Sequence, residues 1–169
     1  MLIDDILLYR LAPEGASEEI WLEAESATIT APMEVYDDPA ASGGKCIGTQ
    51  SGTGDSTSNP PDPAGTARIP FTVVKGGTYS ISGRVIIPSG ESFWIRIQGA
   101  TTNTNNHSSG WVRWSDPPTI SSWYWDIIFS ADDGNSDVEW TMQAGNYILE
   151  VGYREDGALL DAIVITKID

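Results

Sequence analysis

The chain has 169 residues and a formal net charge of −15, from 24 acidic and 9 basic side chains. This length suits one well-cored domain. So strong a negative charge repels phosphate backbones and anionic lipid surfaces, which argues against nucleic acid and membranes as partners. No apolar run reaches the roughly 18 residues that a membrane-spanning helix needs.

Strand-length apolar runs alternate with clusters of Gly, Pro, Asn and Asp along the chain. No long stretch repeats apolar residues at the three-and-four spacing of a helix. This pattern predicts an all-β protein, a β-sandwich of two antiparallel sheets. The expected strands cover residues 20–24, 68–74, 78–87, 92–98, 123–130, 146–153 and 160–166.

Alternation within these runs predicts which side chains form the core, because successive residues of a strand point to opposite faces. Trp123 and Trp125 share a face with Ile127, and Trp140 precedes a turn region, so we expect these three Trp side chains in the core. The other residues expected to form core faces are Tyr79, Ile81, Val85, Ile87, Tyr147, Leu149, Val151 and Tyr153.

Two features indicate a binding surface. Alternation in 92–98 leaves Trp94 and Arg96 side by side on the face opposite the core, where we expect an exposed Trp beside an Arg. The connections 51–67 and 99–122 are long, and long loops in compact domains are usually functional or disordered. The second loop contains two Trp residues whose rings either bind a ligand or fold back on the core, and their polar surroundings favour binding. Its candidate residues are Asn105, His107, Trp111 and Trp114.

A weak internal repeat suggests how the chain is divided. Residues 2–11 (LIDDILLYRL) align with residues 159–168 (LLDAIVITKI) at matching Leu, Asp and Ile positions. We therefore expect residues 1–11 to be the last strand of a preceding tandem module, residues 12–19 a linker, and residues 20–169 the functional module. The alternative is chance recurrence of a short apolar strand.

A carboxylate pair near the start of that module suggests a metal site. Glu23 and Glu25 lie on one face of the expected first strand, about 7 Å apart by the rise per residue. Calcium takes six to eight oxygen ligands, and Asp161 near the other end of the chain is a third candidate. The alternative is a solvated strand face without metal.

Several short motifs together resemble family 6 and family 35 carbohydrate-binding modules. They are EAE at 23–25, SGGK at 42–45, QAGNYILEV at 143–151 and REDGALLDAIVI at 154–165. The resemblance covers roughly residues 20–169 and implies a β-jelly roll with a structural calcium ion. Its implied calcium ligands are Glu23, Glu25 and Asp161, with backbone carbonyls near Lys45 and of Asp161.

The resemblance also implies a function, which is non-catalytic binding of a polysaccharide by a module of a secreted protein. The module would hold an attached hydrolase or lyase on its substrate, and a tandem copy would add avidity. In this family ligand sites lie in loops at one sandwich edge or on a concave sheet face, although residues 65–71 contain no Tyr or Trp to serve as the site-forming aromatic residue usual after the second strand. The implied ligand residues are Trp94, Arg96, Asn105, His107, Trp111, Trp114, Arg154, Glu155 and Asp156.

Two alternatives compete with this interpretation. The first is a structural spacer or adhesin repeat without a sugar site, which burial of Trp94, Trp111 and Trp114 would favour. The second is an enzyme, but His107 is the only histidine, no nucleophile elbow accompanies it, and no carboxylate pair can be placed across a cleft. The negative charge favours neutral glycans, unless Arg96, Arg113 or Arg154 reverses it locally.

Overall fold

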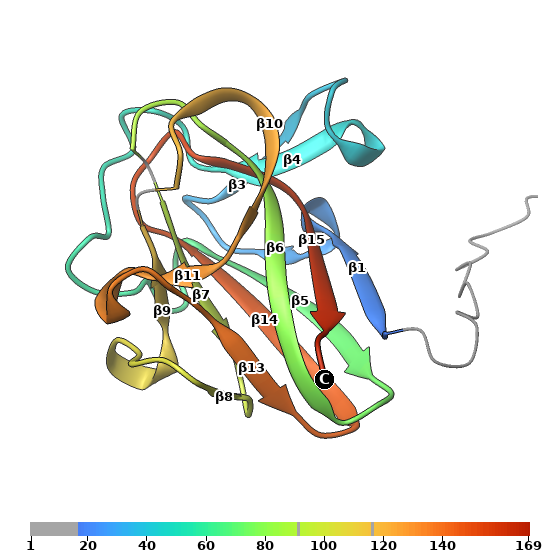
Figure 1. Ribbon diagram of the computed structural model, residues 1–169. Helices are drawn as coiled ribbons and strands as arrows, with labels where there is room; N and C mark the ends of the chain where they lie inside the picture. The colour runs from blue at the N-terminus through green and yellow to red at the C-terminus, as the bar shows by residue number, and fades with distance from the viewer. Residues whose placement is uncertain (1–16, 91, 116) are drawn as a thin grey trace, which may run out of the picture.

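The computed structural model describes residues 17–90, 92–115 and 117–169 and shows two antiparallel sheets that face each other (Figure 1). Both sheets turn one face to a shared core, which confirms the all-β sandwich. No helix among these residues is long and apolar enough to cross a membrane. Four single turns of 3-10 helix interrupt the strands, namely η1 (Ala24–Ser26), η2 (Ser42–Gly44), η3 (Ser108–Gly110) and η4 (Ala131–Asp133).

The larger sheet, called sheet A, is built around the pairing of two long strands. In order it contains β3 (Glu34–Asp37), β4 (Lys45–Gly48), β15 (Leu159–Lys167), β6 (Gly77–Ile87), β13 (Glu139–Met142) and β8 (Thr101–Thr102). Two further strands attach to the central pair, with β1 (Glu19–Glu23) on β15 and β10 (Ile120–Ile127) on β6.

The second sheet, called sheet B, has five strands. In order they are β2 (Thr28–Ile29), β5 (Thr66–Val73), β14 (Gly145–Tyr153), β7 (Phe93–Ile97) and β9 (Val112–Trp114). A separate two-stranded ribbon joins β11 (Phe129–Ser130) to β12 (Ser136–Asp137).

The core lies between the sheets and largely follows the predicted alternation. All four predicted residues of β6, from Tyr79 to Ile87, are fully buried, and so are Leu149 and Val151 of β14. Tyr147 and Tyr153 are half-buried at the ends of that strand and pack against the core. The period-2 pattern therefore identified the central strands of both sheets correctly.

Each expected strand is present, but the run 123–130 is divided. Strand β10 ends at Ile127, and Phe129 belongs to the β11–β12 ribbon. The short strands β3, β4, β9 and β13 were not predicted, because three or four residues carry too little alternation to stand out.

The expected N-terminal strand, residues 1–11, lies outside the described residues. The expected linker, residues 12–19, overlaps the folded module at its last residue, because β1 begins at Glu19. The Glu18 carboxylate also accepts hydrogen bonds from the backbone N–H groups of Val74 and Lys75, each at 2.8 Å. Glu18 and Glu19 are therefore part of the folded module.

One glycine in β6 allows the two sheets to pack closely. A Cβ atom on Gly83 would stand 2.8 Å from the buried Trp114 ring and 3.2 Å from the side chain of Leu160. A methyl group there must displace the indole, because the core is close-packed.

We predict that Gly83→Ala lowers the free energy of unfolding by about 1–3 kcal/mol, the usual cost of overpacking a core. Urea denaturation measures the change. Ser82→Ala on the outer face of the same strand is the matched control, and it should be neutral within about 0.5 kcal/mol. Equal stabilities of the two variants would contradict this account of the packing.

Candidate functional site

The structure brings several of the predicted ligand residues together on the outer face of sheet B. The Arg96 guanidinium lies 4.3 Å from the centroid of the Trp111 ring. The Trp94 ring lies 4.9 Å from the His107 ring and 5.7 Å from the Arg154 guanidinium. Sequence reasoning therefore grouped these residues correctly, although they come from β7, the turn after β14 and a long loop.

The rings of this cluster are nevertheless buried, so the expectation of exposed Trp platforms is wrong. Trp94 is 0% exposed and Trp111 is 2% exposed. The Trp94 indole N–H donates to the backbone oxygen of Ser56 at 2.9 Å, so a loop expected to be functional folds back over the sheet. Alternation placed Trp94 on the outer face correctly, but it could not show that this loop covers that face.

The charge of Arg96 is also neutralised. Glu150, fully buried on β14, accepts hydrogen bonds from Arg96 and from Arg68 on the neighbouring strands, and from the Gln98 amide at 3.0 Å. Asp62 of the covering loop pairs with Arg68 at 3.1 Å and with Arg96 at 3.6 Å. A buried carboxylate held between two guanidinium groups is a structural network, because removing one partner leaves a charge unpaired.

Two of the predicted ligand residues lie away from this cluster. Trp114 is a core residue, with its ring 6.0 Å from Phe93 and its N–H donating to Asp126 at 3.2 Å. Burial raises the pKa of the Asp126 carboxyl, partly offset by that hydrogen bond. Asn105 donates instead to the carboxylate of Asp133 at 3.1 Å. Neither belongs to a shared ligand site.

The side chains of the turn at 154–156 form hydrogen bonds and an ion pair that hold neighbouring loops in place. Arg154 donates to the hydroxyls of Ser92 at 3.1 Å and Ser115 at 3.3 Å and pairs with Glu155. The Asp156 carboxylate accepts the backbone N–H groups of residues 52 and 54, each at 2.8 Å, at the start of the covering loop. These contacts explain the polar turn without a ligand.

The exposed Trp side chains lie on the opposite sheet. Trp125 is 43% exposed and Trp123 is half-buried, so their assignment to the core is wrong, whereas Trp140 is buried as predicted. Strand β10 carries apolar residues on both faces, and alternation shows which of them share a face without showing which face is inside. Sequence reasoning missed Trp21, which is 62% exposed. The available signal was that Trp21 shares a face with Glu23.

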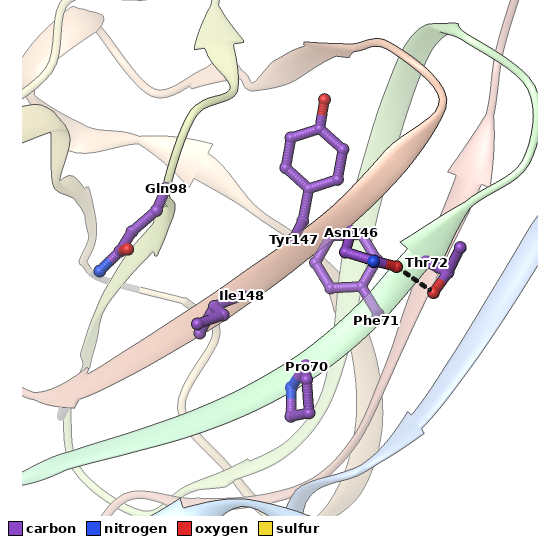
Figure 2. A pocket seen from close by; sticks show the side chains of 7 residues that line it. All are labelled: Pro70, Phe71, Thr72, Gln98, Asn146, Tyr147 and Ile148. Atoms are coloured by element: carbon purple, nitrogen blue, oxygen red, sulfur yellow. Dashed lines mark hydrogen bonds between the residues drawn. The ribbon is translucent and has the colours of Figure 1, made fainter.

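An open hollow of about 420 Å³ lies on the uncovered part of the outer face of sheet B. Figure 2 shows Ile148 and Pro70 in the middle of it, with the side-chain amides of Gln98 and Asn146 on either side. The Thr72 hydroxyl donates to the Asn146 amide oxygen at 2.8 Å, which leaves the amide N–H groups of Asn146 for a ligand. No charged side chain lines the hollow. Its lining residues are Pro70, Phe71, Thr72, Gln98, Asn146, Tyr147 and Ile148.

A second hollow, of about 380 Å³, lies at the loop edge of sheet A. The Thr49 hydroxyl in its lining is buried and has no hydrogen-bond partner in the part of the chain that the structure describes. Burial raises the pKa of the neighbouring Cys46 thiol to about 11, so at neutral pH the thiol is protonated and a poor nucleophile. Its lining residues are Tyr36, Asp37, Asp38, Pro39, Cys46, Thr49, Gln50, Ser51, Gly157 and Leu159.

The three predicted calcium-ligand carboxylates approach the loop at 42–45. The Ser42 hydroxyl donates to Glu23 at 2.8 Å, and its N–H donates to Asp161 at 2.9 Å. A Cβ atom on Gly43 would stand 2.7 Å from a carboxylate oxygen of Glu25. The other oxygen of Glu25 is buried and finds no hydrogen-bond partner within residues 17–90, 92–115 and 117–169.

The negative charges of these three carboxylates are only partly balanced by neighbouring cations. Burial raises the pKa of the Glu25 carboxyl, and the charges of Glu23 and Asp161 raise it further. Arg84 pairs with Asp161, while Lys45 pairs with Asp37 at 2.9 Å. Among the described residues, no three Asp, Glu, His or Cys side chains already form a group that could hold a metal ion. The donors are nonetheless all oxygen and mostly anionic, which suits a hard cation such as calcium.

Comparison with solved structures identifies the fold. A β-(1,4)-mannanase of Podospora anserina with a family 35 module matches with a TM-score of 0.58 at 15% identity, over 89% of this chain and 28% of that chain. A family 35 carbohydrate-binding module of Clostridium thermocellum matches at 0.55 and 19% identity, over 87% and 98%. A family 6 module of a Cellvibrio mixtus lichenase, in complex with cellotriose, matches at 0.56 and 16% identity, over 89% and 98%.

This is the fold of family 6 and family 35 carbohydrate-binding modules. The sequence itself matches no protein-family model and no curated protein. The chain spans 28% of the mannanase but nearly the whole of each isolated module, so it corresponds to one module of this fold.

In this carbohydrate-binding-module fold, the burial of a Trp side chain determines how much stability its substitution costs. We predict that Trp94→Ala destabilises the module by about 3–5 kcal/mol, the usual cost of removing a fully buried aromatic ring. Trp21→Ala on the exposed face should cost about 1 kcal/mol or less. Thermal and urea denaturation of both variants measures the difference, and equal losses would contradict the burial described here.

Proposed function

We propose that the chain is a non-catalytic module that binds a neutral polysaccharide or oligosaccharide. The observation that carries the proposal is the uncharged hollow on sheet B, where the amides of Gln98 and Asn146 flank an apolar floor at Ile148. Binding sites of this kind combine an apolar surface with a few well-placed polar groups. A sugar ring matches this arrangement, because its C–H face is apolar and its hydroxyls pair with planar amides.

The preference for a neutral ligand follows from the charges. The net charge of −15 repels uronate and sulfate polymers. The arginines that might have reversed this preference are paired, since Arg96 contacts Glu150, Arg113 contacts Asp132 at 2.8 Å, and Arg154 contacts Glu155. The structural neighbours include a module in complex with cellotriose, a neutral β-glucan fragment, which supports the same choice.

The same comparison supports a proposal about the wider setting of the module. The mannanase is a longer chain of which this fold is one part, so we propose that this module also belongs to a multimodular secreted protein and targets an attached hydrolase or lyase. We assign it no catalysis of its own. His107, the only histidine, packs on Trp94 and contacts Ser108, and no acidic or basic side chain lines the sheet B hollow.

One observation favours a second candidate function, a structural spacer or adhesin repeat without sugar binding. The three Trp side chains expected to form the ligand platform are all buried. In that case the aromatic cluster only stabilises the covering loop. Binding measurements decide between the two functions.

We also propose that Glu23, Glu25 and Asp161 hold a structural calcium ion, with backbone oxygens near Lys45. The buried, unpaired carboxylate oxygen of Glu25 supports this, because an unpaired buried anion is costly without a cation. Calcium would supply positive charge there and link β1, the 42–45 loop and β15. The carboxylates themselves would close around the ion, since they do not yet form a complete ligand group.

Saturating calcium, about 100-fold above its Kd, should raise the free energy of unfolding by about 2.7 kcal/mol over the chelated protein. Without metal, the folded Glu25 carboxyl keeps its proton to higher pH than the unfolded chain, so stability should fall as pH rises above 4.5. Glu25→Gln should remove both the calcium response and this pH dependence. Glu139→Gln is the matched control, and an unchanged melting temperature after chelation and calcium readdition would contradict the calcium site.

For the sugar site, we predict that Asn146→Ala weakens binding to a neutral glucan or mannan about fivefold, the cost of losing one or two hydrogen bonds. Ile148→Asp should abolish binding at the hollow, because it places a charge on the apolar floor. Gln143→Ala, outside the hollow, is the control. Insoluble-polysaccharide pull-down and calorimetry measure the effect, and no binding of the unaltered module to any polysaccharide would establish the spacer function instead.

A further inference from the structure

The outer face of sheet A carries a surface that is distinct from both hollows. Register places Trp21 of β1 in one row with Val164, Ser82 and Ile127, and the next row joins Glu23, Ala162, Arg84 and Trp125. All of these side chains lie on one face of the sheet, because paired residues and their second neighbours share a face. In Figure 1 the strands β1, β15, β6 and β10 form this face.

Two indoles meet above the middle of the face. The centroids of Trp21 and Trp125 are 5.5 Å apart, and their planes are nearly perpendicular at 89°. The positions between them on β15 and β6 hold Ala162 and Ser82, which are small, beside Val164 and Arg84. We call this pair the tryptophan corner. Both rings remain exposed, at 62% and 43%.

The tryptophan corner has unused hydrogen-bonding capacity. Within the described part of the chain, neither indole N–H of the pair has a hydrogen-bond partner, whereas those of Trp94, Trp114 and Trp123 do. Sugar ligands stack a C–H face on one ring and use such N–H groups for hydroxyl oxygens. Two perpendicular rings enclose a single pyranose from below and from one side.

The surroundings of the corner are polar rather than continuously apolar. Ser80, Ser82 and Thr166 contribute hydroxyls to the same face, and Glu19 of β1 is an exposed carboxylate with no ion pair among the described residues, whereas the Glu23 carboxylate accepts a hydrogen bond from Ser42. Such acceptors and hydroxyls suit a ligand rich in hydroxyl donors. A protein-docking surface would have a larger unbroken apolar centre.

Arg84, the cation that the described strands place on this face, is already engaged. The Arg84 guanidinium pairs with the buried Asp161 carboxylate and lies 5.5 Å from the Trp123 ring. Trp123 in turn donates to Asp38 at 3.0 Å. The corner therefore offers no free positive charge to an acidic polymer, while its carboxylates repel one.

We propose that the tryptophan corner is a second glycan-binding site, which accepts one pyranose unit of a neutral polysaccharide chain. It lies on the opposite face of the sandwich from the sheet B hollow. The two sites are on opposite faces and cannot share one short oligosaccharide. The module therefore binds two chains, or two segments of one chain, and gains avidity on an insoluble polysaccharide. The corner stands on its own observations and does not depend on the hollow.

The test compares Trp21→Ala, Trp125→Ala and the hollow variant Ile148→Asp in the full chain, with Trp21→Phe as the conservative control. A panel of neutral oligosaccharides is titrated by calorimetry, and thermal denaturation checks that each variant is folded. Loss of the stacking ring should weaken binding about tenfold at the corner, and Trp21→Phe should recover most of it. The Ile148→Asp variant should retain the corner component.

The outcomes separate the two sites. Wild-type affinity in both Trp variants, with binding lost in Ile148→Asp, would overturn the corner and leave the proposed function intact. Weakened binding in the Trp variants with a residual component abolished by Ile148→Asp would establish two sites. No glycan binding by the wild-type protein would overturn both proposals, and a change from dimer to monomer in the Trp variants by analytical ultracentrifugation would show that the face joins two copies of the chain.

Discussion

The pairing of β6 with β15 is the interaction on which the rest of this structure depends. It runs from Leu159 opposite Ile86 to Lys167 opposite Tyr79, and sheet A is completed by strands that attach to either side of it. The register shifts between Leu160 and Ala162, so a β-bulge takes Asp161 out of the alternation. Bulges commonly re-aim a side chain at a functional site, and this one directs Asp161 to Ser42 and Arg84.

The outer face of this pairing carries Ser82 and Ala162 beside Val164 and Arg84, and the two sheets differ in what they expose. On the outer face of sheet A, Trp21 and Trp125 contact each other and remain exposed to solvent. Sheet B instead buries Trp94 beneath the loop that Asp156 and Asp62 hold down, and only the area around Ile148 stays uncovered. This module therefore exposes apolar surfaces on opposite sides of the sandwich.

The sequence was sufficient for the long strands and for part of the grouping of residues, because alternation depends only on local geometry. It identified the buried face of β6 and placed Trp94 beside Arg96. It could not reveal that a loop covers Trp94, since that depends on contacts such as the one with Ser56, 38 residues away. It also could not decide which face of β10 is outside, and so it assigned Trp125 to the core.

The most direct test of this account is to follow the seven indole N–H signals by nitrogen–proton NMR while a neutral oligosaccharide is added. The account predicts that the signals of Trp21 and Trp125 shift, together with the side-chain amide of Asn146. The buried indoles of Trp94, Trp111 and Trp114 should stay unchanged. Shifts confined to Trp94 and Trp111 would contradict it, because they would mean that the covering loop opens and that the ligand binds the buried cluster.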